Sequence, residues 1–139
     1  MKDPLYAVID TNVIVSAALR WNSIPGSIIQ AAMRGTIHAF TDSTIVAEYL
    51  EVLQRPKFGF PTFVSDTIVN GILEYGSTIE RIPTKLSLPD PKDLPFFEVT
   101  LTARRSIDCH LVTGNKKHFP NEPFVLSPRE YLTTYLHPM

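Results

Sequence analysis

The most informative stretch of this chain reads Tyr6-Ala7-Val8-Ile9-Asp10-Thr11-Asn12 and runs on into Val13-Ile14-Val15. Its first half predicts a buried strand over residues 5–9 that delivers a carboxylate to its own C-terminal end. Open parallel sheets bind their ligands in the crevice outside the carboxyl ends of the strands. Asp10 is therefore a metal ligand if other acids gather at that edge, and a helix cap if none do.

Strand and helix signals alternate through most of the chain. The strands are expected over residues 5–9, 36–41, 78–82, 109–113 and 124–126, and the helices up to Leu19 and over residues 27–33, 44–54, 63–75 and 94–105. This alternation predicts an α/β fold in which helices cover both faces of a parallel sheet. A Pro25-Gly26 break is expected before the second helix, and Ser127-Pro128-Arg129-Glu130 predicts a last helix that starts with a capping box. No repeat or linker divides the 139 residues, so we expect one domain over 1–139.

The composition, with 44% hydrophobic and 19% charged residues, is typical of a folded soluble protein. The net charge of -1 provides no general basic field, so a nucleic-acid partner would need a local basic patch. The single cysteine, Cys109, excludes a disulfide scaffold and a cysteine-based zinc site. No apolar run approaches the roughly 18 residues of a membrane span. We expect a cytoplasmic protein that is neither exported nor embedded in a membrane.

Two further acids are expected at the same edge of the sheet as Asp10. Glu48 lies beside the apolar face of its helix, and Asp93 is at or near the N-cap of the helix that follows it. Taken singly, Glu48 is an ordinary solvated glutamate, and each aspartate is an ordinary cap that stabilises a helix by about 1 kcal/mol. If the three carboxylates lie close together, they raise one another's pKa and destabilise the fold unless a cation compensates. The set therefore predicts a hard-metal site for Mg²⁺ or Mn²⁺, and phosphodiester hydrolysis as the leading reaction.

These acids also belong to an ordered series of motifs. The motifs of the series are Asp10-Thr11-Asn12, Glu48-Tyr49, Asp90-Pro91-Lys92-Asp93 with Phe96, Phe97 and Glu98, and Val112-Thr113-Gly114-Asn115. Their order and spacing, over nearly the whole chain, resemble those of the motifs of PIN-domain ribonucleases. The stretches 55–58 and 115–120 are most similar to the bacterial branch described as toxin components of toxin/antitoxin systems. The resemblance implies a three-layer α/β/α sandwich with a five-stranded parallel sheet and a metal-dependent endoribonuclease site.

In that site, the resemblance makes Asp10, Glu48 and Asp93 the catalytic metal ligands. Asn12 and Thr113 would orient ligands or waters. Many PIN domains carry an aspartate after the glycine of the last motif, whereas this chain has Asn115. The lost charge leaves open whether one or two metal ions bind. Glu98, one helical turn beyond Asp93, either compensates for it or is a solvated helix residue.

Several residues are candidates for contacts with partners. The basic loop residues Arg55, Lys57, Lys116 and Lys117 would meet the phosphates of single-stranded RNA. The neighbouring Phe58, Phe60 and Phe119 are stacking platforms for bases or, as we favour, core residues. The resemblance also implies an antitoxin partner. A homodimer could form through the apolar helices at 27–33 and 63–75, which are otherwise core elements.

Two other functions remain open from the sequence. The first is a PIN-fold module that binds RNA or protein but has lost robust activity through the Asn115 change. The second is a small phosphatase or phosphotransfer domain with Asp10 as nucleophile. The sequence speaks against the second, because such phosphatases need an aspartate where Asn12 stands.

Overall fold

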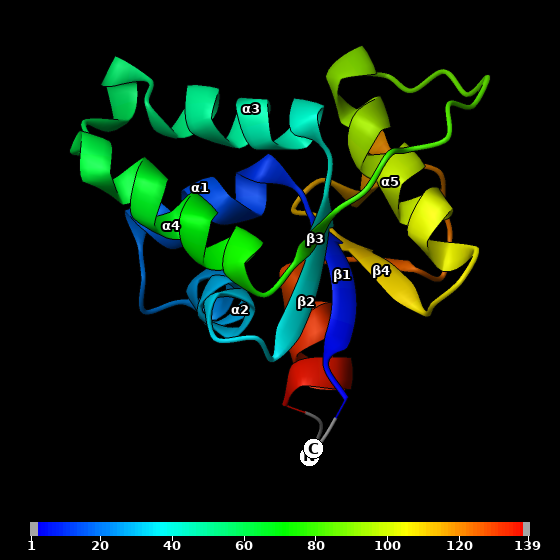
Figure 1. Ribbon diagram of the computed structural model, residues 1–139, viewed down its shortest axis with the longest axis horizontal. Helices are drawn as coiled ribbons and strands as arrows, with labels where there is room; N and C mark the ends of the chain where they lie inside the picture. The colour runs from blue at the N-terminus through cyan, green and yellow to red at the C-terminus, as the bar shows by residue number, and fades with distance from the viewer. Residues whose placement is uncertain (1–2, 138–139) are drawn as a thin grey trace.

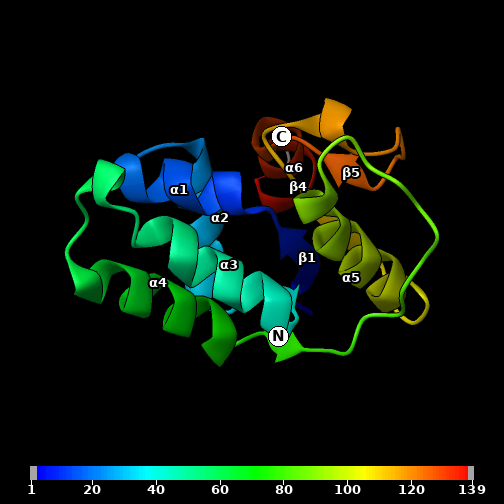
Figure 2. The ribbon, with the colours of Figure 1, turned by 90° about the horizontal axis from the view of Figure 1, so that it is seen from above.

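The computed structural model describes residues 3–137 and is built on one sheet of five parallel strands in the order β3-β2-β1-β4-β5. The strands are β1 (Leu5–Ile9), β2 (Ile37–Thr41), β3 (Ser77–Thr78), β4 (Cys109–Val112) and β5 (Val125–Leu126). In Figures 1 and 2, α5 lies on one side of this sheet, and α1, α2 and α4 lie together on the other. The predicted three-layer α/β/α sandwich with a five-stranded parallel sheet is confirmed.

The connections between strands are mostly helical. The α-helices are α1 (Thr11–Leu19), α2 (Ile24–Met33), α3 (Ser43–Leu53), α4 (Thr62–Glu74), α5 (Leu94–Arg104) and α6 (Pro128–Tyr131). Short 3₁₀ turns form η1 (Pro56–Phe58), η2 (Pro91–Asp93) and η3 (Lys116–His118), and a π-helical turn, η4 (Leu132–Leu136), follows α6. Among the residues that the structure describes, no helix is both long and apolar enough to cross a membrane.

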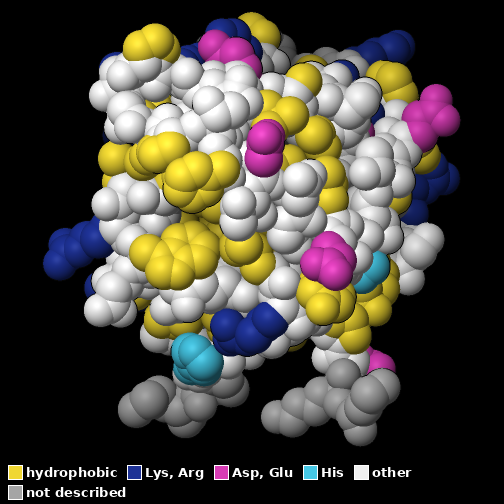
Figure 3. All heavy atoms as spheres, turned by 60° about the vertical axis from the view of Figure 1, so that its left-hand side comes forward, with side chains coloured by type: hydrophobic (Ala, Val, Ile, Leu, Met, Phe, Trp, Pro, Cys, Tyr) yellow, Lys and Arg dark blue, Asp and Glu magenta, His cyan; other side chains and the backbone are white. Residues whose placement is uncertain are grey.

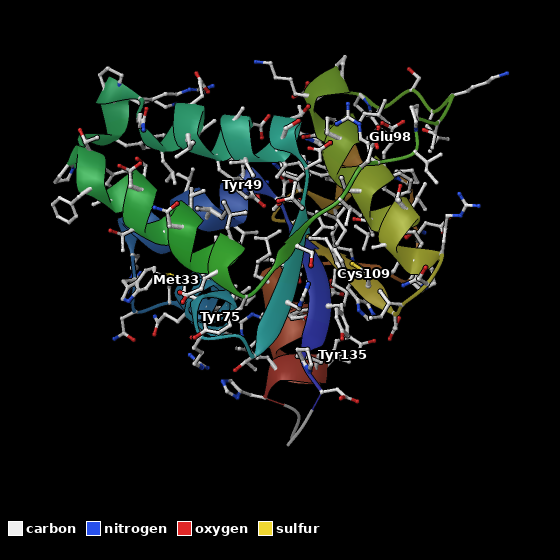
Figure 4. All side chains as sticks on the ribbon, in the orientation of Figure 1. Met33, Tyr49, Tyr75, Glu98, Cys109 and Tyr135 are labelled. Atoms are coloured by element: carbon white, nitrogen blue, oxygen red, sulfur yellow. The ribbon has the colours of Figure 1, made fainter. Side chains whose placement is uncertain are left out.

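The central strand β1 is the anchor of the core. Its last three residues are completely buried, since β1 pairs with both β2 and β4 and is covered on both faces. Tyr49 of α3, labelled in Figure 4, is also buried, and its hydroxyl donates a hydrogen bond to the carbonyl of Ile9. This bond fixes α3 to the end of β1, where the candidate site begins.

Some local predictions are confirmed. Ser127 and Glu130 form the capping box of α6 as expected, with Pro128 in the first turn. Gly35 follows α2 with a φ of 86°, the left-handed conformation that ends a helix and that glycine adopts without strain.

Two other local predictions are wrong. Pro25-Gly26 does not break a helix, because α2 already starts at Ile24 with Ser23 as its cap, and proline is tolerated in the first turn. The strand expected over 78–82 ends at Thr78. Ile82 instead donates its N–H to the hydroxyl of Thr102 on α5, so the chain leaves the sheet early.

The two helices proposed as a dimer interface contribute their apolar faces to the core. Ile28 and Ile29 of α2 are completely buried, and Ile68 and Ile72 of α4 are nearly so. Outside the core, large apolar side chains still reach solvent, among them Phe63, which is 68% exposed. Figure 3 shows such side chains in separate groups on the side of the molecule where α1 to α4 lie.

Candidate metal centre

The carboxyl ends of β1 and β4 bring the first pair of site residues together. Ile9 and Val112 are partners in the sheet, so Asp10 and Thr113 are the next residues along each strand. The backbone N–H of Asp10 donates to the carbonyl of Val112 over 2.9 Å, and the Thr113 hydroxyl donates to Asp10 Oδ2 over 2.8 Å. Both residues are buried. The strand register therefore holds one oxygen of the Asp10 carboxylate in a fixed position.

Asn12, in the first turn of α1, connects the same two strand ends. Its Nδ2 lies 3.3 Å from Asp10 Oδ2 and donates to it, and its Oδ1 accepts a hydrogen bond of 3.0 Å from the N–H of Gly114. The Asp10 side chain itself makes no capping hydrogen bond to α1, although Asp10 occupies the N-cap position. Asp10 therefore stands at the N-cap position without the side-chain hydrogen bond of an ordinary helix cap.

Glu48 and Asp93 come to this edge from the flanking helices. Glu48 is half-buried in the second turn of α3 and accepts a hydrogen bond from the hydroxyl of Thr11. Asp93 ends η2, just before α5, in a helical conformation and without a capping hydrogen bond. Its Oδ2 is buried and has no hydrogen-bond partner among the residues that the structure describes, although His118 Nδ1 lies 3.4 Å away at ion-pair distance. Asp93, too, is not held there as a helix cap.

The three acids line one open pocket of about 400 Å³, which we call the acid pocket. Its wall also includes Asp90, Lys92, Phe58, His118, Asn12 and Asn115. Within residues 3–137, however, no three His, Cys, Asp or Glu side chains stand close enough together to hold a metal ion as they are placed. The acids therefore share a pocket but do not form a closed coordination shell.

Burial and mutual repulsion both act on these carboxylates. Burial raises the pKa of Asp10 from its ordinary 3.8 to about 6, with further upward contributions from the charges of Asp93 and Glu48, while the Thr113 hydrogen bond opposes the rise. Burial also raises the pKa of Glu48, and the charge of Asp93 adds to it. Burial and then the charge of Asp90 raise the pKa of Asp93, and His118 opposes them. Such shifts mark negative charges that lack a sufficient counter-charge.

The donor set fits a hard divalent cation. It consists of carboxylate oxygens, with the amides of Asn12 and Asn115 on the pocket wall, and within residues 3–137 no hydrogen bond reaches the buried Asp93 Oδ2. Oxygen donors of this kind suit Mg²⁺ or Mn²⁺, whereas zinc prefers nitrogen and sulfur.

A comparison with protein-family models matches residues 6–117 to the PIN domain. The chain belongs to the PIN-domain family. PIN domains are in general nucleases, so a nuclease type of activity follows from this membership. Comparisons with curated proteins and with solved structures found no match.

Glu98 does not line the acid pocket of this PIN domain. It is 3% exposed on α5, where Figure 4 labels it. Its Oε1 is 3.2 Å from Arg81 Nε, and its Oε2 accepts the hydroxyl of Thr84 over 2.9 Å. Arg81 also forms an ion pair of 2.9 Å with Asp42, the N-cap of α3. The Glu98 carboxylate thus fastens the connection between β3 and α5, and it does not replace the charge missing at Asn115.

The predicted RNA-binding lysines and arginine do not line the acid pocket either. Arg55 pairs with Glu51, Lys116 pairs with Glu130 over 2.8 Å, and Lys57 lies 5.1 Å above the Phe58 ring. Lys117 is exposed. All four remain on the surface in loops and 3₁₀ turns.

Sequence reasoning missed one cation, Lys92, which lines the acid pocket. It stands inside the motif Asp90-Pro91-Lys92-Asp93, whose position was the signal that could have revealed it. Of the three phenylalanines, Phe58 lines the acid pocket, whereas Phe119 is a buried core residue stacked on Phe97. The core role favoured for these aromatics therefore holds for Phe119 and for Phe60, which is partly buried against the core, and not for Phe58.

Proposed function

We propose that this PIN domain is a Mg²⁺- or Mn²⁺-dependent endoribonuclease that cleaves single-stranded RNA, with Asp10, Glu48 and Asp93 as its catalytic metal ligands. The observation that carries the proposal is the acid pocket, which three carboxylates with raised pKa line together and where, among residues 3–137, no hydrogen bond reaches Asp93 Oδ2. A bound ion supplies Lewis-acid polarisation of the phosphate and a water of lowered pKa.

The residues of the chain prepare this chemistry by holding the carboxylates. Thr113 and Asn12 both donate to Oδ2 of Asp10, which fixes the orientation of this carboxylate. The Thr11 hydroxyl orients Glu48 in the same way. Lys92 and His118 are the basic groups on the pocket wall and suit the phosphate of a bound strand. The exposed Lys57 and Lys117, with Arg55 and Lys116, extend this basic surface along the RNA.

The proposal extends to the cellular location of the enzyme and to its protein partners. We assign it to the cytoplasm, because its one cysteine, Cys109, is a buried free thiol. The resemblance of its 55–58 and 115–120 stretches to bacterial toxins extends the proposal to a toxin role, in which an antitoxin covers the acid pocket. A homodimer is proposed from the resemblance to PIN domains in general, and light scattering of the purified protein tests it.

Metal titration and RNA cleavage test the site together. Calorimetry should show Mn²⁺ binding to the wild type and to Asp66→Asn, a control at an exposed position of α4, and none to Asp10→Asn. Mn²⁺ should also support cleavage of single-stranded RNA by the wild type and the control, and Asp10→Asn and Asp93→Asn should abolish it. Cleavage retained in both site variants would remove the proposed site.

The same assays decide between an enzyme and a binding module. Asn115 is the observation that favours the module, because it removes one acid from the pocket wall. A wild type that binds a range of RNAs in the presence of Mn²⁺ but cleaves none of them would establish the module and refute the nuclease.

A further inference from the structure

A second cavity, of about 280 Å³, adjoins the acid pocket. The two cavities share Asn12, Ser16 and Asn115 as a common wall. Beyond that wall, the second cavity is bounded by Val13, Pro25 and Pro128. None of its lining residues carries a charged side chain. We call it the neutral pocket, in contrast to the acid pocket beside it.

Much of the wall of the neutral pocket is held in place. Both side-chain ends of Asn12 are engaged, by Asp10 and by Gly114. Pro25 and Pro128 stand in the first turns of α2 and α6, and their rings have little freedom to lose. A ligand that enters such a preformed cavity loses little free energy to ordering of the protein.

The common wall also offers polar groups for recognition. The backbone of Asn115 is engaged, since its N–H donates to the Thr113 hydroxyl and its carbonyl accepts from His118. Its side-chain amide is exposed and, among residues 3–137, has no hydrogen-bond partner. An amide can donate to the edge of a nucleobase and accept from it at the same time.

We infer that the neutral pocket binds the base of a nucleotide adjacent to the scissile phosphate, with the Asn115 amide on the edge of that base. This inference rests on the proposed nuclease function. A phosphate does not suit the cavity, because no cationic side chain lines it. An uncharged ring suits its apolar walls and its free amide, and single-stranded RNA presents such unpaired bases. The volume is just below the usual range of about 300–1,000 Å³ for small-molecule sites, which fits one base and not a larger ligand.

The inference gives Asn115 a role of its own. An aspartate at this position would add a negative charge to the wall between the two pockets. The neutral amide leaves metal binding to Asp10, Glu48 and Asp93 and serves the substrate. Asn115 is thus a specificity residue of the same site.

RNA substrates that lack one base test whether that base and the Asn115 side chain act together. A short single-stranded RNA with one mapped cleavage site is made intact and with an abasic nucleotide at each position next to the scissile bond. For the wild type, one of these abasic changes should lower kcat/KM by about tenfold, a loss of about 1.4 kcal/mol. The control Asn70→Ala, at an exposed position of α4, should show the same loss. Asn115→Ala should cleave intact RNA about tenfold less efficiently and be insensitive to the missing base.

The outcomes separate the inference from the proposed function. If the wild type cleaves RNA and the abasic change costs the wild type and Asn115→Ala equally, the neutral pocket holds no base and the nuclease proposal stands. If no RNA is cleaved, the nuclease proposal fails, and fluorescence anisotropy with the same RNAs decides on the pocket. The base assignment is supported if Asp93→Asn binds abasic RNA more weakly than intact RNA while Asp93→Asn/Asn115→Ala binds the two equally. It is overturned if the missing base weakens binding by both variants to the same extent.

Discussion

Replacing Asp10 by asparagine should make the metal-free protein more stable while it destroys the metal site. The structure supplies the magnitude, because the pKa of Asp10 is raised from 3.8 to about 6. Each pKa unit corresponds to about 1.36 kcal/mol, so the ionised carboxylate destabilises the folded state by about 3 kcal/mol. Asparagine keeps the shape and an acceptor for the Thr113 hydroxyl, but it carries no charge.

The dependence on pH follows from the direction of this shift. A raised pKa means that the folded state holds the proton more tightly than the unfolded state does. The contribution of Asp10 to stability is thus complete below about pH 4, falls as the pH rises from about 4 to about 6, and stays lost above that. Asp10→Asn does not titrate, so its advantage over the wild type should be absent at pH 4 and reach about 3 kcal/mol at pH 7.5.

Urea denaturation at several pH values, with a chelator present, measures this difference. Asp66→Asn, which removes an exposed carboxylate from α4, should match the wild type at every pH. Added Mg²⁺ should stabilise the wild type and the control but not Asp10→Asn. A variant that is less stable than the wild type at pH 7.5 without metal, or a difference that does not change with pH, would refute the reasoning.

Two further predictions concern the frame around the site. Arg81→Met should lower the free energy of unfolding in urea by about 3–5 kcal/mol, because it leaves the buried carboxylates of Asp42 and Glu98 without their counter-charge; the exposed Arg105→Met is its control, and equal stability of the two would contradict the ion pairs. Gly26→Ala should cost about 1–3 kcal/mol in the same assay, since the added Cβ would stand 1.9 Å from the carbonyl oxygen of Trp21. In Gly71→Ala the added atom meets only the flexible side chain of Met33, labelled in Figure 4, and a smaller loss is expected; a larger one would contradict the argument.

The fold was predictable because its signals are local. An apolar run that ends on Asp10, a capping box at Ser127 and a helix that ends before Gly35 are each determined by neighbouring residues. The predictions that failed depended on distant contacts. The strand expected to reach residue 82 ends at Thr78, where the chain turns toward α5 and Arg81 pairs with Asp42 and Glu98. Sequence spacing contains no sign of those partners.

The positions of the site residues also divide into those that local signals predict and those that depend on distant contacts. The carboxyl ends of parallel strands lie at one edge of the sheet, which is why Asp10 could be assigned to that edge. Helical periodicity predicted that Glu48 faces the same edge, and both residues line the acid pocket. Helical periodicity did not reveal that Glu98 pairs with Arg81, because α5 is covered by other parts of the protein on both sides near Glu98. Loop cations were equally unpredictable. Lys116 could have faced the pocket or Glu130, and only the folded chain distinguishes the two.

The acid pocket and the neutral pocket together explain why an asparagine suits the wall between them. Asp90 and three carboxylates with raised pKa already line the acid pocket, and Lys92 and His118 do not offset the rise, so a further acid at position 115 would increase the repulsion. On the other side of the wall, a carboxylate would face a cavity without any cation. An amide avoids both costs and can still bond to a base. The residue at position 115 thus separates two tasks, binding a cation at Asp10 and accepting the neighbouring base.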